Sequence, residues 1–246
     1  MSSPDLLQLA PSLYRLRIAG GAAHLLNCYL WVDDHGVTLI DTGWPDSAGL
    51  ILEALSALGK SQQDVTRIVL THFHEDHAGS AAEIAGWSRA EVIAGDADAA
   101  YVRGIERGPL PILTPREQSI HPATSEPPHS PPCRVDRVVS DGDSLDFAGG
   151  AIVLGVPGHT PGSIALYLPD ADTILTGDAV AEFHGEVILG VFNVDRQAAT
   201  RSLNKLAATG AQIAGFGHGE AVLHNASARI ASAIDAFADD ADGTPQ

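Results

Sequence analysis

The chain is poor in positive charge. It has 14 lysines and arginines against 31 aspartates and glutamates in 246 residues, a formal net charge of −17. A surface this acidic repels phosphate backbones, so the composition argues against a nucleic-acid partner. Apolar runs of membrane-spanning length are also lacking, as is the basic and apolar start of a secretory signal. We therefore expect a cytoplasmic protein that does not enter membranes.

Cysteine is also scarce. Cys28 and Cys133 are the only two, which excludes a disulfide framework and leaves a single bridge open. The chain is nevertheless 45% hydrophobic and 18% charged, so it can bury a substantial core.

Short strand-like segments dominate the chain, and helical patterns separate them in a mixed order. This order predicts an α/β protein in layers. The expected strands are 13–18, 24–32, 36–40, 65–70, 91–94, 134–139, 144–147, 151–156, 163–168, 173–175 and 212–215, and the expected helices are 46–58, 80–87, 96–107, 196–208 and 225–238.

Residues 108–132 differ from the rest because they are rich in proline and have little periodicity. We expect a long loop there, which either covers a site with its apolar residues or forms a solvated excursion. Residues 239–246 should be frayed.

A dense cluster of possible metal ligands follows the strand 65–70. The run His72-Phe73-His74-Glu75-Asp76-His77 places three imidazoles and an aspartate within six positions. Imidazole and carboxylate are the nitrogen and oxygen ligands that zinc prefers. A tight loop after a strand can direct several of these side chains onto one or two ions.

Four further polar residues follow strands in the same way. Asp41, His159, Asp178 and His218 each lie just beyond an expected strand and close to glycine, which lets the backbone approach closely. Each alone is a weak signal. Together with the histidine run they form one pattern.

That pattern, from Asp41 to His218, resembles the metallo-β-lactamase superfamily. The resemblance implies an α/β fold of the four-layer αβ/βα sandwich type, with residues 1–246 forming a single domain. It also implies two metal ions, with zinc as the default and iron or manganese also compatible with the ligands.

Carried over residue by residue, the resemblance assigns His72, His74 and His159 to the first metal. Asp76, His77 and His218 would bind the second, Asp178 would bridge the two, and Asp41 would orient a ligand histidine. Asp76 and Asp178 are then the expected catalytic residues.

The same resemblance implies hydrolysis by a metal-bridging hydroxide, because two cations lower the pKa of bound water. Zinc β-lactamases typically lack an aspartate at the position of Asp178, whereas glyoxalase II-like thioesterases and acyl-homoserine lactonases have it. The chain departs from both groups. Arg229 is the only lysine or arginine after His218, and Ala181 stands where those lactonases have a tyrosine.

The expected function is therefore hydrolysis of a small-molecule ester, lactone or thioester. A mononuclear iron persulfide dioxygenase, a β-lactamase-like amide hydrolase and a non-catalytic binding protein remain alternatives, and a homodimer is left open. Five of the other histidines are expected to be structural or solvated: His24, His35, His121, His129 and His184. Two residues, His184 and Trp44, could instead line the pocket.

Overall fold

Two β-sheets form the centre of the computed structural model, which describes residues 4–18, 25–120 and 130–238. The larger sheet has seven strands in chain order, antiparallel from β1 to β4 and parallel from β4 to β7. Its strands are β1 Leu6–Ala10, β2 Leu13–Ile18, β3 Leu26–Asp33, β4 Gly36–Ile40, β5 Val65–Leu70, β6 Glu91–Gly95 and β7 Arg137–Val139.

The second sheet has five strands in the order β14-β11-β10-β9-β8. Its pairs are antiparallel except for β11 and β14, so β9, β11 and β14 all point the same way. The strands are β8 Ser144–Leu145, β9 Ala151–Gly155, β10 Ile164–Leu168, β11 Thr173–Leu175 and β14 Ile213–Gly215; the hairpin β12 Val180–Phe183 and β13 Glu186–Leu189 pairs separately.

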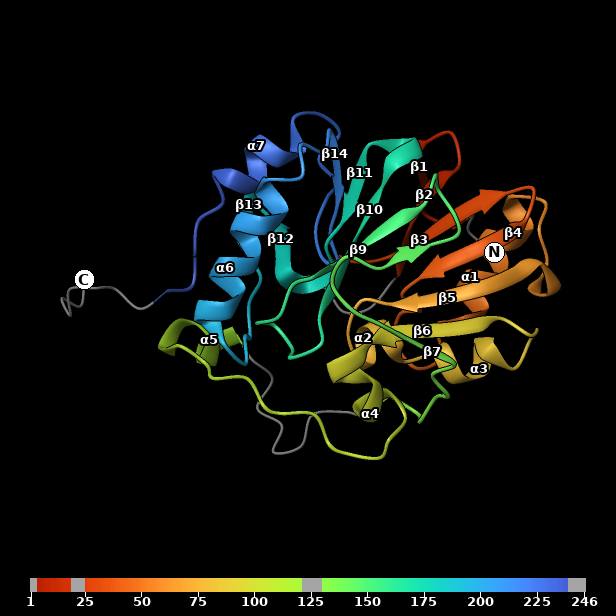
Figure 1. Cartoon of the computed structure of the whole chain (residues 1–246), viewed down its shortest axis with the longest axis horizontal. Helices are drawn as coiled ribbons and strands as arrows, with labels where there is room; N and C mark the ends of the chain where they lie inside the picture. Colours follow the sequence, from red (N-terminus) through yellow and green to blue (C-terminus); the bar gives the residue numbers. More distant parts are fainter. Residues whose placement is uncertain (1–3, 19–24, 121–129, 239–246) are drawn as a thin grey trace.

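Three apolar clusters hold the layers together. One lies between the first sheet and its helices, one between the two sheets, and one between the second sheet and α6 and α7. Figure 1 shows the resulting arrangement, with helices on both outer sides. The predicted αβ/βα sandwich is confirmed. The helices are α1 Ala48–Ala57, α2 Glu75–Ala78, α3 Ala81–Ala85, α4 Ala99–Val102, α5 Pro115–Ile120, α6 Arg196–Ala207 and α7 Ala226–Ala231.

Several predicted elements are shorter in the structure. The helix expected at 96–107 is a 3₁₀ turn followed by α4, and it ends because Gly104 has a left-handed φ of 68°. Of the helix expected at 225–238, only α7 is helical in the structure. The strands expected at 134–139 and 144–147 are present only as the shorter β7 and β8. The strand β1, the helix α2 and the hairpin of β12 and β13 were not predicted.

The prediction of an unbroken loop at 108–132 is also wrong, because α5 lies within it. This helix begins with a capping box. The backbone N–H of Thr114 donates to Glu117 Oε2 at 2.9 Å, and the N–H of Glu117 donates to Thr114 Oγ1 at 3.1 Å. Pro115 occupies the first helical position, where its missing N–H costs nothing. The pattern Thr-Pro-x-Glu was a readable signal.

Both cysteines, Cys28 and Cys133, are buried and free, so the bridge that the sequence left open does not form. Within the described ranges, the helices are all too short or too polar to cross a membrane. His24, His121, His129 and the tail 239–246 lie outside the described residues.

Core packing gives a first testable prediction. Leu39 in β4 is 0% exposed, whereas Leu7 in β1 is 40% exposed. Leu39→Ala should lower the free energy of unfolding by about 2–5 kcal/mol, because it removes buried apolar surface and leaves a cavity. Leu7→Ala should change it by no more than about 0.5 kcal/mol. Urea denaturation followed by circular dichroism measures both, and equal losses would contradict the described core.

Candidate metal centre

Every site residue predicted from the sequence lies in the described chain and at one edge of the sandwich. Asp41 follows β4 and His72 follows β5, its parallel neighbour. His159, Asp178 and His218 follow β9, β11 and β14, the three strands of the second sheet that share a direction. Strands of one direction end at the same edge of a sheet, so the topology itself brings these loops together.

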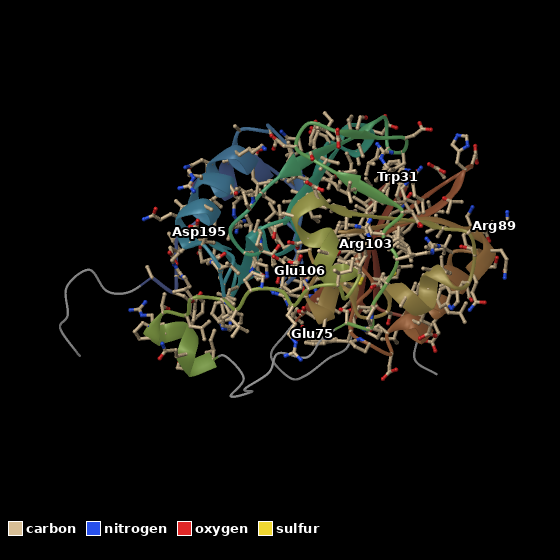
Figure 2. The ribbon with its side chains drawn as sticks, turned by 60° about the horizontal axis from the view of Figure 1, so that its bottom comes forward. Trp31, Glu75, Arg89, Arg103, Glu106 and Asp195 are labelled. Carbon is tan, nitrogen blue, oxygen red and sulfur yellow. The ribbon has the colours of Figure 1, made fainter. Side chains whose placement is uncertain are left out.

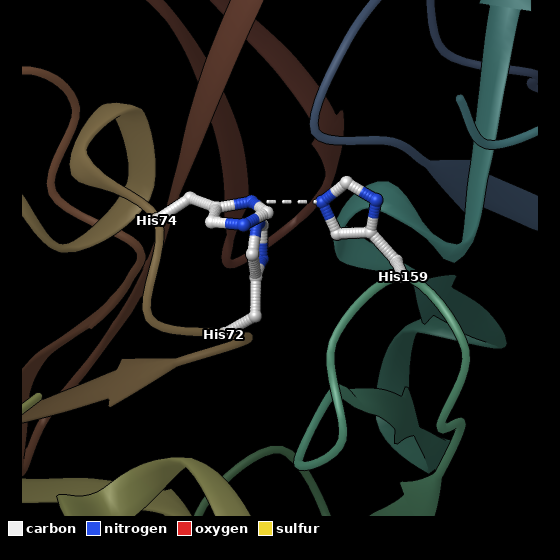
Figure 3. A group of neighbouring side chains, drawn as sticks. All are labelled: His72, His74 and His159. Carbon is white, nitrogen blue, oxygen red and sulfur yellow. Dashed lines mark hydrogen bonds between the residues drawn. The ribbon is translucent and has the colours of Figure 1, made fainter. Parts of the chain in front are cut away.

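The first group contains His72, His74 and His159. Each histidine has a ring nitrogen that lies within 4.8 Å of a ring nitrogen of the other two. Figure 3 shows His74 and His159 facing each other from opposite sides, with His74 Nδ1 at 2.9 Å from His159 Nε2. His72 lies below them, with its ring centroid 4.7 Å from each of the other two.

The second group contains Asp76, His77, Asp178 and His218, whose ligand atoms also lie within 4.8 Å of one another. His218 Nε2 lies 3.2 Å from Asp76 Oδ2 and 3.4 Å from Asp178 Oδ2. His77 Nε2 lies 3.2 Å from Asp178 Oδ1 and 3.6 Å from Asp76 Oδ2.

Hydrogen bonds behind the site fix which nitrogen of two histidines is free. His77 Nδ1 lies 2.8 Å from Asp41 Oδ2, and a carboxylate can only accept, so His77 carries its proton on Nδ1. Thr71 Oγ1 donates to the same carboxylate at 2.8 Å and therefore accepts from His72 Nδ1 at 3.0 Å. Both rings then direct Nε2 into the site, and that of His72 is unprotonated.

The ring of His159 is fixed in the same way by a backbone carbonyl. His159 Nδ1 donates to the oxygen of Val191 at 2.9 Å, which leaves Nε2 to face His74 Nδ1. Without a cation, His74 Nδ1 donates a hydrogen bond to His159 Nε2. The same two nitrogens are among the possible metal-ligand atoms of this group, together with a nitrogen of His72.

Three buried side-chain atoms of the kind that ligate metals are consistent with a metal site. His72 Nε2, His77 Nε2 and Asp178 Oδ1 have no hydrogen-bond partner among the described residues. Buried polar atoms without partners are costly, and a metal ion would satisfy all three. Gly217 keeps this space open, because a Cβ there would come within 1.9 Å of Asp178 Oδ1.

Burial keeps the first group neutral. It lowers the pKa of His72 well below the usual value, and burial together with the neighbouring His159 lowers the pKa of His74 to about 3. Burial also lowers the pKa of His159. Neutral imidazole is the form that binds metals, so the three side chains are in the required state at physiological pH.

The second group is dominated by negative charge. Burial alone would lower the pKa of His218, but Asp178 and Asp76 outweigh it and raise the pKa to about 10. The pKa of His77 is raised for the same reason, with Asp41 as a further neighbour. Burial raises the pKa of Asp178, yet His77 and His218 hold it well below its usual value. The carboxylates therefore stabilise positive charge nearby, which a divalent cation could supply in place of the protons on His77 and His218.

One supporting residue was not identified from the sequence. Asp98 is buried and accepts hydrogen bonds from the N–H of Phe73 at 3.1 Å, from Thr160 Oγ1 at 2.7 Å and from the N–H of Gly162 at 2.7 Å. It thereby joins the loop of His72 and His74 to the loop of His159. Burial raises the pKa of Asp98 to about 6. Its position just after β6 was the available signal, because the other site loops also follow strands.

The surroundings of the two residues proposed as pocket lining are as follows. His184 is exposed in the turn between β12 and β13, with a left-handed φ of 52°. Trp44 packs against the first apolar cluster, which matches the core role weighed for it.

Comparisons with known proteins agree with this geometry. Residues 23–218 match the family model of the metallo-beta-lactamase superfamily. The chain belongs to that superfamily. It is 32% identical to a probable metallo-hydrolase of Bacillus subtilis, YflN, over 76% of each chain. The structure of a metallo-beta-lactamase family protein from Thermus thermophilus superposes with a TM-score of 0.69 at 28% identity, covering 91% of this chain and 78% of that one.

A more distant relative is a hydroxyacylglutathione hydrolase of Hyphomonas neptunium, which is 31% identical over 57% of this chain and 41% of its own length. The superfamily match and the metallo-hydrolase relatives identify the protein as a metal-dependent hydrolase. The roles of the individual ligands stay predictions.

Asp41 offers a test of these roles, because its carboxylate accepts from His77 and from both the N–H and the hydroxyl of Thr71. Asp41→Asn should lower the affinity for a divalent metal by about 10–100-fold, since the amide leaves at least one donor unpaired and His77 less firmly oriented. Asp34→Asn, at an exposed carboxylate, is the matched control. Titration with Zn²⁺ against a chromophoric chelator measures both, and equal affinities would contradict the role of Asp41.

Proposed function

We propose that the protein binds two divalent metal ions and hydrolyses a small ester, lactone or thioester. The observation that carries the proposal is the place of Asp178. One of its oxygens lies 3.2 Å from His77 Nε2, and the other lies 3.7 Å from His159 Nε2 and 3.4 Å from His218 Nε2. A single carboxylate thus contacts both groups of possible ligands, which is the position of a bridging ligand.

The ligand assignment follows from the two groups. His72, His74 and His159 would hold one ion, and Asp76, His77 and His218 would hold the other, with Asp178 shared. Zinc is the first choice for nitrogen and oxygen ligands of this kind, with iron and manganese next. Ions bound here would activate water and polarise a substrate carbonyl.

We assign to Asp76 the orientation of the attacking water. Burial by itself raises its pKa, but His77 and His218 outweigh burial and bring the pKa to about 2, so the carboxylate is ionised at neutral pH. An ionised carboxylate can accept a hydrogen bond from an attacking water and so orient it.

The surroundings support a substrate with an apolar portion. Leu110 and Ile112 are 62% and 76% exposed on the proline-rich segment, residues 108–132. The backbone of Gly108 lies against the ring of Phe73, and the N–H of Ile112 donates to the oxygen of Asn193 at 2.9 Å. Residues 108–112 therefore run from the loop of His74 to the loop beside His159. The similarity to a hydroxyacylglutathione hydrolase supports including thioesters.

We propose the substrate as a small molecule in the cytoplasm, and not as a nucleic acid or a membrane lipid. Direct assays distinguish ester hydrolysis from two other activities, those of a persulfide dioxygenase and of an amide hydrolase. Oxygen consumption with a glutathione persulfide would indicate a dioxygenase, and preferential cleavage of a chromogenic cephalosporin would indicate an amide hydrolase.

Asp178→Ala is the variant that tests the proposal. The purified chain should cleave at least one class in a panel of p-nitrophenyl esters of increasing acyl length, lactones and S-lactoylglutathione. Loss of the shared carboxylate should reduce kcat/KM by about 100-fold or more and reduce the bound metal. Glu186→Ala, at an exposed position of β13, should leave both unchanged. Asp178→Ala with full activity and full metal content would disprove the bridging assignment.

A further inference from the structure

The proline-rich segment contains a buried carboxylate. Glu117 in α5 is 0% exposed, although its neighbours Arg116 and Gln118 are exposed. Removing an ionised carboxylate from water is unfavourable unless hydrogen bonds and charges replace the water. The partners of Glu117 therefore show what its burial achieves.

The two oxygens of Glu117 have different partners. Oε2 accepts from the N–H of Thr114 at 2.9 Å and so completes the capping box of α5. Oε1 leaves the helix and accepts from the N–H of Phe192 at 2.9 Å and from Arg196 Nη1 at 3.1 Å. A helix cap needs only the first oxygen. The second joins the proline-rich segment to the loop before α6, and Figure 1 shows α5 beside the first turn of α6.

Phe192, the residue held by this oxygen, has an unfavourable backbone conformation. Its φ is 58°, in the left-handed region that bulky side chains rarely adopt. Such conformations persist only when surrounding contacts impose them, and they are frequent beside functional sites. A second bond supports the same loop, because the N–H of Ile112 donates to the oxygen of Asn193 at 2.9 Å.

The loop in turn holds a predicted metal ligand. The carbonyl of Val191, adjacent to Phe192, accepts from His159 Nδ1 at 2.9 Å. The N–H of Val194 donates to the backbone oxygen of His159 at 3.3 Å. A continuous series of contacts therefore leads from Glu117 through the Phe192 backbone to the ring of His159.

We propose that Glu117 is a positioning residue for His159. By holding Phe192 in its left-handed conformation, Glu117 keeps the Val191 carbonyl where it accepts from His159 Nδ1. That bond fixes the tautomer of the ring and directs Nε2 into the three-histidine group. The inference rests on the proposed function only in requiring that this group binds metal.

Glu117→Gln is the informative variant, because it keeps the shape of the side chain and removes its charge. A glutamine has one accepting oxygen, so at least one of the two backbone N–H groups that donate to Glu117 would face an amide NH₂. Glu106→Gln is the matched control. Glu106 is exposed a few residues before the same segment and is labelled, with Asp195 at the start of α6, in Figure 2.

The measurement is a stepwise Zn²⁺ titration of the full chain against a chromophoric chelator. For Glu117→Gln we expect about a 10-fold loss of affinity at the three-histidine group and a smaller loss at the second group, where Glu117 has no described contact. Glu106→Gln should match the wild type at both. A merely structural role would lower the unfolding temperature without separating the two metal affinities. Unchanged affinity at the three-histidine group, or an equal loss at both groups, overturns the proposal.

Amide hydrogen exchange on the wild-type protein decides the matter if the variant does not fold. The Phe192 amide should exchange at least about 10-fold more slowly than an exposed loop amide, because it donates to a buried carboxylate. Rapid exchange at Phe192 overturns the proposal. If the wild-type chain binds no Zn²⁺, the proposed function fails by itself, and the exchange of Phe192 still reports separately on the Glu117 contact.

Discussion

Face-to-face packing of the two sheets is the contact on which the site depends. Strands β4 and β5 deliver Asp41 and His72, while β9, β11 and β14 deliver His159, Asp178 and His218. Apolar residues of both sheets meet in one buried cluster and bring these strand ends together; they include Ile40, Val69, Val153, Leu166 and Leu175. Closely packed interiors transmit small displacements, so the separation of the sheets also sets the separation of the predicted ligands.

Hydrogen bonds from neighbouring residues orient the predicted ligand side chains that sheet packing brings together. Asp41 orients His77, Asp98 joins two of the loops, and the Val191 carbonyl orients His159. Each uses a carboxylate or a carbonyl, which can only accept, so each fixes the protonated nitrogen or the backbone donor that faces it. Asp178 and Asp76 add negative charge around His77 and His218, which suits the centre to divalent cations.

The sequence was most informative where its signals were local. The strands 13–18, 36–40, 65–70 and 173–175 were predicted with the bounds that the structure has, because apolar runs ended by glycine or polar residues are readable within a few positions. β1 was missed because it is a short edge strand with a single buried side chain. The site residues were found through a spaced motif. Asp98 and Glu117 were not, because their roles depend on contacts to residues 62 and 75 positions away, Thr160 and Phe192.

The central claim is that one carboxylate, Asp178, lies between two metal ions. The most direct measurement is a crystal structure of the purified full chain with anomalous scattering data at the metal edge, together with metal analysis of the same sample. The account predicts two ions per chain, one among His72, His74 and His159, the other among Asp76, His77 and His218, with Asp178 contacting both. A single iron ion, or two ions with Asp178 bound to neither or only one, would contradict it.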